Sequence, residues 1–231
     1  MRFIAYSRSV PLAILVAVAL SGCSTSSDPE TAATIVTANA APIAAFQPAE
    51  RDPVTMYREM DDKGFRIAAV NAAGMKPELV RQVVDYPTTQ VPGTVVVDQT
   101  TRFLYFVLPG GQAIRYAVAV GPVARAFPGG EAVIAHKASW PRWTPTPNMI
   151  KRNPAQYERH RGGIDGGPAN PMGARALYMH QNGVDTYYRV HGTNDPSSIG
   201  RAVSAGCIRL LNQDIIDLHD RVRPGAKIVV L

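Results

Sequence analysis

Residues 190–210 read VHGTNDPSSIGRAVSAGCIRL, and they join the end of an apolar run to a polar loop and a cysteine. The β-type residues from Thr186 onward predict a strand that ends at His191. Glycine, proline, asparagine and serine dominate the next part, which predicts a loop. The loop over residues 192–203 is long enough to return the chain, so we expect Cys207 to lie beside His191.

This pairing has a chemical reason. A thiol with the ordinary pKa of about 8.5 is mostly protonated at neutral pH, and it needs a nearby base or cation to become a nucleophile. The imidazole of His191 titrates near neutrality and is the candidate base. Gly206 has no side chain, which leaves room for a substrate and leaves backbone amides free to face a developing oxyanion.

The rest of the chain is rich in short β-type runs separated by turn residues, which predicts a mostly β fold. Short helices are expected over residues 76–84, with Pro77 in the first turn, and from a cap at Asn212 through Leu218. The glycine- and proline-rich part between the strands near residues 137 and 177 predicts a long functional loop. Strands are predicted at 94–97, 102–108, 113–120, 134–137, 177–179, 186–191 and 227–231.

The amino terminus is typical of a secretory signal. Arg2 and Arg8 precede an apolar stretch over residues 10–20, shorter than the roughly 20 apolar residues that span a bilayer. The junction Leu20-Ser21-Gly22-Cys23 resembles the lipobox of bacterial lipoproteins, which implies a signal peptide over 1–22 and lipidation of Cys23. Ser24 then favours the outer membrane, so the resemblance implies a periplasmic, lipid-anchored protein.

Residues 24–50 consist mainly of serine, threonine, alanine and proline and show neither the helical nor the strand period. They predict a flexible tether with an end-to-end distance of about 30 Å, although a segment packed on the domain is the alternative. We place the tether within residues 23–75 and the folded domain at 76–231. Because Cys23 is used by the anchor, Cys207 is left as a candidate reactive thiol, with an inert buried cysteine as the alternative.

The His191 to Cys207 stretch is similar to the signature of the L,D-transpeptidase catalytic domain, the YkuD fold. The similarity extends over residues 75–231 and includes Pro92-Gly93-Thr94, Arg115-Tyr116, Trp140-Pro141-Arg142-Trp143-Thr144-Pro145 and Asn170-Pro171-Met172-Gly173-Ala174-Arg175-Ala176-Leu177-Tyr178. It implies a sandwich of mixed β-sheets with short helices. It also implies acyl transfer from the third residue of a peptidoglycan tetrapeptide stem to an amine, with release of D-alanine.

The same resemblance implies the role of each site residue. Cys207 is the nucleophile, His191 is base and acid, and the Gly192 carbonyl orients the imidazole. The Gly206 and Cys207 amides form the oxyanion hole, and Ser204 either orients the motif or only turns the chain. Arg209 either binds a substrate carboxylate or braces a loop, and Tyr178 is a candidate for the substrate groove, as are Trp140 and Trp143, although such aromatic residues are more often core.

One position departs from the family pattern. Many members have histidine or serine where this chain has Ala205. A hydrogen bond from that side chain is therefore missing, which affects the expected tuning of the oxyanion hole but not the nucleophile.

Other classes of function fit the sequence less well. The five histidines show no i, i+4 pair and no His-Glu-x-x-His pattern, so no metal or other cofactor is expected. The formal net charge of +6 becomes +4 without the two arginines of residues 1–22, and it comes without a basic run, which argues against nucleic acid as a partner. This mild excess suits either a mixed, solvated surface, which the pattern favours, or an anionic wall polymer. Papain-like peptidases place cysteine before histidine, the reverse of the order here.

Alternatives remain within the implied activity. Water as acceptor gives an L,D-carboxypeptidase, and a protein amine makes an outer-membrane protein a partner. The remaining alternatives are a hydrolase of protein–peptidoglycan links and a non-catalytic wall-binding lipoprotein.

Overall fold

A nine-stranded sheet dominates the structure, with the strands in the order β10-β9-β8-β7-β11-β4-β5-β6-β3. The computed structural model describes residues 52–122, 127–204 and 206–231. The large sheet mixes parallel and antiparallel pairs: β11 pairs with β4 in parallel and with β7 antiparallel. The predicted mostly β fold with a mixed sheet and short helices is confirmed.

The strands are short and most helices have only one or two turns. The strands are β1 (Met60–Asp62), β2 (Phe65–Ile67), β3 (Gln82–Asp85), β4 (Val95–Asp98), β5 (Phe103–Val107), β6 (Gln112–Ala117), β7 (Gly130–Ser139), β8 (Arg175–Gln181), β9 (Val184–His191), β10 (Ile208–Arg209) and β11 (Lys227–Val230). The helices are α1 (Pro53–Met56), η2 (Ala72–Gly74), η3 (Pro77–Leu79), α2 (Pro147–Arg152), α3 (Pro154–Tyr157), η4 (Glu158–His160), η5 (Pro196–Ser198) and α4 (Asn212–Arg221).

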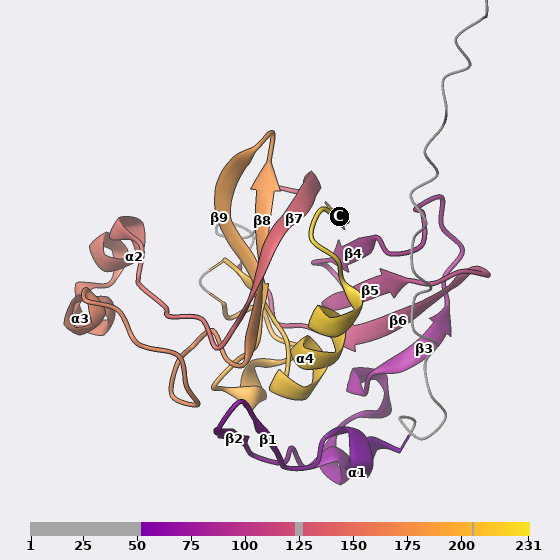
Figure 1. Cartoon of the computed structure of the whole chain (residues 1–231), viewed down its shortest axis with the longest axis horizontal. Helices are drawn as coiled ribbons and strands as arrows, with labels where there is room; N and C mark the ends of the chain where they lie inside the picture. The colour runs from indigo at the N-terminus through magenta and orange to yellow at the C-terminus, as the bar shows by residue number, and fades with distance from the viewer. Residues whose placement is uncertain (1–51, 123–126, 205) are drawn as a thin grey trace, which may run out of the picture. The chain divides into compact units, whose positions relative to one another are not determined.

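The two halves of the large sheet face one core. Strands β7–β9 run side by side, and β3–β6 cross them in a different direction, with α4 between the two groups (Figure 1). After β6 the chain continues to Ala119, whose N–H and carbonyl pair with Arg209 of β10 at 2.9 and 2.8 Å. Because β10 stands at the other end of the strand order, this pair curls the sheet around the core. Inward residues of both halves, such as Phe106 and Met179, share one buried cluster with Ile215 of α4.

The predicted turns of the β4–β5–β6 meander are present. Asp98 accepts hydrogen bonds from the N–H groups of Thr100 and Thr101, which caps the tight turn after β4. Gly110 and Gly111 both have positive φ, at 79° and 74°, a backbone conformation that glycine adopts without strain. The β-type runs that predicted these strands therefore agree with the turn chemistry between them.

The helix predicted over residues 76–84 is wrong beyond Leu79. A single 3-10 turn at Pro77–Leu79 is followed by β3, an edge strand in which Val83 lies opposite Ile114 of β6. Pairing with β6 satisfies the backbone of β3, and Val83 packs against the main core. Leu79, Val80, Val83 and Val84 stand at helical spacing, but a half-buried strand can carry the same residues. Periodicity alone could therefore not decide between a helix and a strand.

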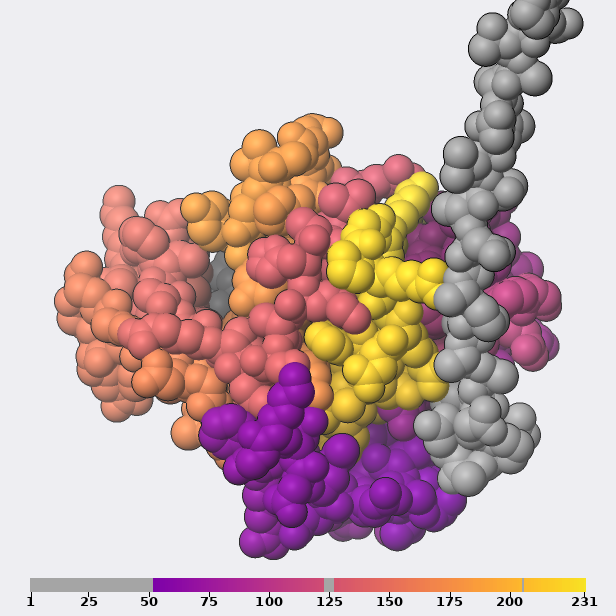
Figure 2. Space-filling view, in the orientation of Figure 1, coloured from indigo at the N-terminus to yellow at the C-terminus, as the bar shows by residue number. Residues whose placement is uncertain are grey.

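The folded part of the chain begins earlier than the predicted boundary after residue 75. Tyr57 is fully buried, and it packs with Met56 against Leu211 at the start of α4. The purple amino-terminal segment lies against the yellow carboxyl-terminal residues in Figure 2. Asp62, beside the β1–β2 turn, accepts two hydrogen bonds from Arg175 at 2.6 and 2.8 Å. These buried contacts make residues 52–75 part of the domain.

Several predictions fall outside the described residues. The signal peptide, Cys23 and the tether over residues 24–50 belong to this group, as does Ala205. All described residues fall within one compact unit. Among them, none of the helices has the length and apolar character needed to cross a membrane.

Candidate active site

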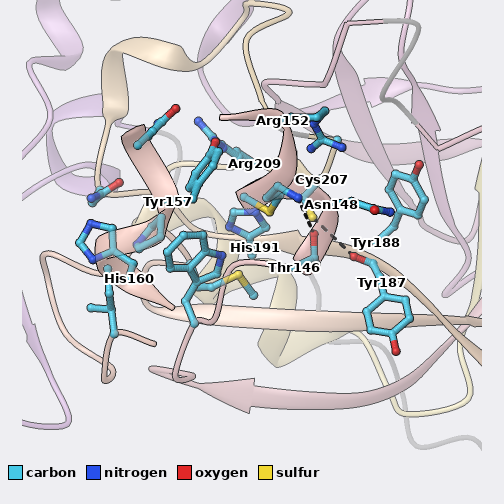
Figure 3. Close-up of a pocket in the computed structure, with 18 of the residues that line it drawn as sticks. Thr146, Asn148, Arg152, Tyr157, His160, Tyr187, Tyr188, His191, Cys207 and Arg209 are labelled. Carbon is cyan, nitrogen blue, oxygen red and sulfur yellow. Dashed lines mark hydrogen bonds between the residues drawn. The ribbon is translucent and has the colours of Figure 1, made fainter. Parts of the chain in front are cut away.

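Two wall segments, together with Ala169, Pro171 and Met172, line an open cavity of about 1230 Å³ at the end of strands β9 and β10. One segment, here called the motif wall, contains the cavity-lining residues between Thr186 and Arg209. The other, the helical wall, contains the lining residues between Trp143 and Ile164 and comes from the insertion between β7 and β8. Figure 3 shows side chains of both walls around Cys207 and His191.

His191 ends β9 and is almost fully buried, at 4% exposed. Its Nδ1 lies 2.6 Å from the carbonyl oxygen of Gly192, and because a carbonyl only accepts, Nδ1 carries the proton. The other nitrogen, Nε2, is therefore the basic one in the neutral ring. Burial and the charge of Arg209 lower the pKa of His191 to about 3, against partial opposition from the Gly192 and Met172 carbonyls. The imidazole is neutral at physiological pH, as a general base must be.

Asn212 holds the loop that follows His191. Its Oδ1 accepts the N–H groups of Ala174 and Thr193 at 2.9 and 3.3 Å, and its Nδ2 donates to the Thr193 carbonyl at 2.9 Å. A Cβ on Gly192 would collide with this side chain, so the position requires glycine. The predicted helix cap at Asn212 is wrong: Leu211 is the N-cap of α4, and the Asn212 amide is committed to the loop.

Cys207 directly precedes β10, which runs parallel to β9 and places Arg209 opposite His191. The cysteine is partly exposed and lines the same cavity as His191. Its Sγ lies 4.0 Å from the Tyr187 carbonyl oxygen. Burial raises the pKa of the Cys207 thiol, while a hydrogen bond from the Arg189 backbone and the charges of Arg189 and Arg209 lower it in part. The resting pair is therefore a thiol beside a neutral imidazole.

Ser204 organises the turn before the cysteine. Its buried hydroxyl donates to the Cys207 carbonyl at 2.5 Å and accepts the Gly206 N–H at 3.1 Å. Of the two predicted roles for Ser204, the orienting one agrees with these bonds. Gly206 has φ of 141°, which only glycine adopts readily, and this backbone turns its amide toward Ser204. The Gly206 amide is thus bonded to Ser204 here, and the use of the Gly206 and Cys207 amides as oxyanion donors stays a prediction.

Arg209 supplies positive charge beside the reactive pair. Its backbone is fixed by Ala119, and its side chain lines the cavity. The Nε atom is buried without a hydrogen-bond partner in the described part of the chain. A guanidinium in this position suits a substrate carboxylate. The other predicted role of Arg209, bracing a loop, is not supported by any described contact of its side chain.

Tyr178 does not line the cavity, although the resemblance suggested a place in the substrate groove. Its ring stacks on His136 at a centroid distance of 3.9 Å, and the Arg189 guanidinium lies 4.4 Å from the ring centroid. Strand alternation explains the difference, because the neighbours Leu177 and Met179 point into the core. Of the two tryptophans, Trp143 lines the cavity and Trp140 is buried against the β1–β2 segment.

The helical wall was predicted only as a long functional loop. Thr146 and Asn153 cap α2 and α3 through bonds to Met149 N and Gln156 N, and each helix begins with proline. Caps followed by proline are the sequence signal that could have located these helices. Toward the cavity the wall presents Trp143, Tyr157 and His160 together with Arg152 and Arg159. The only carboxylate among the described lining residues is Asp195. The cavity therefore favours an anionic ligand.

The described residues contain no group of three or more histidine, cysteine, aspartate or glutamate side chains arranged to hold a metal ion. A partly exposed thiol, a neutral imidazole with an unprotonated nitrogen and a nearby cation make a site that suits nucleophilic acyl transfer.

Comparison with known proteins identifies the family of this domain. The family model of the L,D-transpeptidase catalytic domain, YkuD, matches residues 92–230. "Probable L,D-transpeptidase ErfK/SrfK" of Escherichia coli strain K12 is 33% identical over 139 residues, which are 59% of this chain and 43% of that protein. "Probable L,D-transpeptidase YbiS" of the same strain is 31% identical over 150 residues, 64% of this chain and 47% of that protein. The matches thus span less than half the length of these curated relatives.

A crystal structure from Brucella melitensis, named "Probable carnitine operon oxidoreductase caia", is 46% identical and covers 70% of this chain and 99% of that chain, with a TM-score of 0.47. The activity in that name is said of that protein alone. The family assignment comes from the domain match, which covers more than half of this chain. The chain belongs to the L,D-transpeptidase catalytic domain family, YkuD.

Proposed function

We propose that this protein is a peptidoglycan L,D-transpeptidase that forms a thioester on Cys207. One observation carries the proposal: Cys207 and His191 line the same cavity, and the Gly192 carbonyl holds the imidazole so that Nε2 is unprotonated. A thiol with such a base beside it can attack an acyl group that water alone attacks slowly.

In the first half of the reaction, the Cys207 sulfur attacks the carbonyl carbon of the third stem residue. His191 Nε2 takes the thiol proton as the C–S bond forms. The C–N bond to D-alanine then breaks, and the imidazolium returns that proton to the departing amine. The products are free D-alanine and an acyl group joined to Cys207 as a thioester.

In the second half, an amine of another stem or of a protein attacks the thioester carbonyl. His191 takes a proton from this amine, the C–S bond breaks, and the proton passes to the sulfur. The thiol and the neutral imidazole are restored, and a new amide bond links donor and acceptor. Water in place of the amine gives a carboxylate, which is the L,D-carboxypeptidase outcome.

Arg209 binds a carboxylate of the donor stem in this proposal. Its Nε is buried without a partner in the described chain, and its charge acts on His191 from across the β9–β10 pair. A carboxylate bound there satisfies the guanidinium and fixes the stem relative to the sulfur.

Incubation with defined tetrapeptide muropeptides, followed by mass analysis of the products, tests the proposal. Dimers linked between third residues, or acyl transfer onto an added protein amine, are the expected products. Tripeptides without dimers would assign a hydrolase, and no turnover with either acceptor would contradict the proposal. Cys207→Ala is the negative control, and residual product with this variant would remove Cys207 from the reaction.

We also propose that Cys23 carries a lipid and that the protein is anchored in the periplasm, with Ser24 directing it to the outer membrane. The support is the pattern Leu20-Ser21-Gly22-Cys23 after a short apolar stretch. Cys23→Ala is expected to move the protein from the membrane fraction to the soluble fraction. A variant that still pellets with outer membranes would contradict the anchor.

A further inference from the structure

Strand β9 contains a bulge next to the Cys207 sulfur. His180 of β8 lies opposite Asp185, and Tyr178 lies opposite Arg189, so three residues of β9 face a single residue of β8. Within the bulge, Tyr187 has φ of 62°, which is uncommon for a residue with a large side chain. Such a backbone costs about 1–3 kcal/mol and persists only where its surroundings hold it in place.

Asp185 and Arg189 hold the two ends of this bulge together. Arg189 donates from Nη1 and Nη2 to the two carboxylate oxygens of Asp185 at 2.7 and 2.8 Å. Asp185 Oδ1 also accepts the Tyr187 N–H at 2.8 Å, and Arg189 Nη1 also donates to the Tyr188 carbonyl at 2.8 Å. A planar guanidinium can make this set of bonds because its donors have a fixed fork geometry.

The ring of Tyr178 fixes the guanidinium from a third side. The guanidinium carbon of Arg189 lies 4.4 Å from the ring centroid, and His136 stacks on the same ring. The Arg189 side chain is only 12% exposed, whereas Asp185 is 34% exposed. Ion pair, carbonyl contact and aromatic contact together leave the side chain little freedom.

The bulge delivers two backbone groups to the sulfur. The Tyr187 carbonyl oxygen lies 4.0 Å from Sγ, marked by a dashed line in Figure 3. The Arg189 N–H and the Arg189 charge favour the thiolate. His191 and Arg209 line the described cavity with Cys207, and the other titratable or charged side chains in that lining are Arg152, Tyr157, Arg159, His160, Tyr187, Tyr188 and Asp195.

We propose that Arg189 is a positioning residue for Cys207, and that its clamp with Asp185 and Tyr178 fixes the bulge whose backbone groups hold the sulfur. The proposal rests on the proposed function only in taking Cys207 as the nucleophile. Arg189 acts through the bulge and does not contact substrate, which separates it from Arg209 in the cavity.

Alkylation of Cys207 by iodoacetamide across a range of pH tests the clamp. The full chain is used, and the mass of the peptide that contains Cys207 reports the rate at that residue. Arg189→Gln is expected to move the midpoint of the rate profile to higher pH and to slow alkylation below the midpoint by about tenfold. Arg189→Lys keeps the charge but loses the fork, so we expect it to restore only part of the rate.

A matched control isolates the clamp from general effects. Arg66→Gln removes an exposed ion pair with Glu59 outside the clamp and should leave the profile unchanged. Asp185→Asn breaks the same clamp from its more exposed end but keeps the Arg189 charge, so it should shift the profile in the same direction by a smaller amount, as Arg189→Lys does, and it keeps the test open if Arg189→Gln folds poorly.

A wild-type profile for folded Arg189→Gln or Asp185→Asn would overturn the proposal. Full rescue by Arg189→Lys would also overturn it, because it would show that only the positive charge at this position matters. The assay needs no peptidoglycan. If the variants change the alkylation profile but the wild type shows no transpeptidation, the proposed function is rejected and the clamp is kept.

Discussion

The two walls of the cavity are built in different ways. On the motif wall, His191 is buried, and backbone carbonyls, Ser204 and Asn212 hold the reactive segment with bonds of 2.5–3.3 Å. On the helical wall, α2 and α3 have only one or two turns each, and Arg152 and Gln156 are exposed. A preorganised wall suits bond making and breaking, whereas an exposed cationic wall suits selection of a ligand.

Among the changes that test this difference between the two walls, replacing the nucleophile should have the largest effect on activity. Cys207→Ser should lower the rate of product formation by about a thousandfold or more, because the serine hydroxyl beside His191 has too high a pKa to replace the thiol. The measurement is muropeptide turnover, with thermal unfolding as the control for an intact fold. Turnover near that of the wild type would move the chemistry away from the motif wall.

Loss of the Ser204 hydroxyl should come next. Ser204→Ala leaves the Gly206 amide and the Cys207 carbonyl without their buried partner, at about 1–3 kcal/mol. We expect a tenfold to hundredfold slower acylation, measured by stopped flow with a carbapenem, since the resemblance implies that these compounds acylate Cys207. Ser197→Ala, at an exposed serine of the same loop, is the matched control. Equal rates for the two variants would mean that the motif wall tolerates loss of its internal bonds.

The pH dependence should reveal the charge of Arg209. Because His191 has a pKa lowered to about 3, it stays neutral as the pH falls through its ordinary value of 6.5, and the acid limb of kcat/KM should lie below that value. Arg209→Gln removes a charge that lowers this pKa, so the acid limb should move to higher pH. Substrate binding should also weaken by about tenfold. An acid limb near 6.5 in the wild type, or one unmoved in the variant, would contradict this electrostatic description.

Much of this site could be predicted from sequence because its residues lie close together along the chain. The spacing from His191 to Cys207 is local, and so are the strand patterns and the turns at Asp98 and Gly110. Tyr178 could not be placed correctly, because the side of the sheet that it occupies depends on strand pairing with β9. The bulge at residues 186–188 depends on bonds between side chains and backbone that no periodicity records.

The helical wall escaped prediction for a different reason. Its helices are too short for an apolar stripe to show, so only caps and prolines indicate them. The boundary after residue 75 was misplaced because Tyr57 and Asp62 find their partners in distant segments, at Asp214 and Arg175. Contacts that are distant in sequence carry no local signal.

The smallest predicted effect is on the helical wall. Arg152→Gln removes one of its cavity-facing charges and should raise KM for an anionic stem by about threefold to tenfold, with kcat nearly unchanged. Lys151→Gln changes the neighbouring exposed cation, which does not line the cavity, and should have no effect. An equal change in both variants would show a general charge effect, and a fall in kcat alone would place Arg152 with the chemistry.

Trapping the acyl-enzyme tests the central claim most directly. The wild-type protein is mixed with a tetrapeptide stem, quenched in acid within one turnover and analysed by mass spectrometry of its peptides. The claim predicts that the peptide containing Cys207 gains the mass of the tripeptide acyl group, with D-alanine released in equal amount. A gain that retains D-alanine, or an acyl group on any other residue, would contradict it.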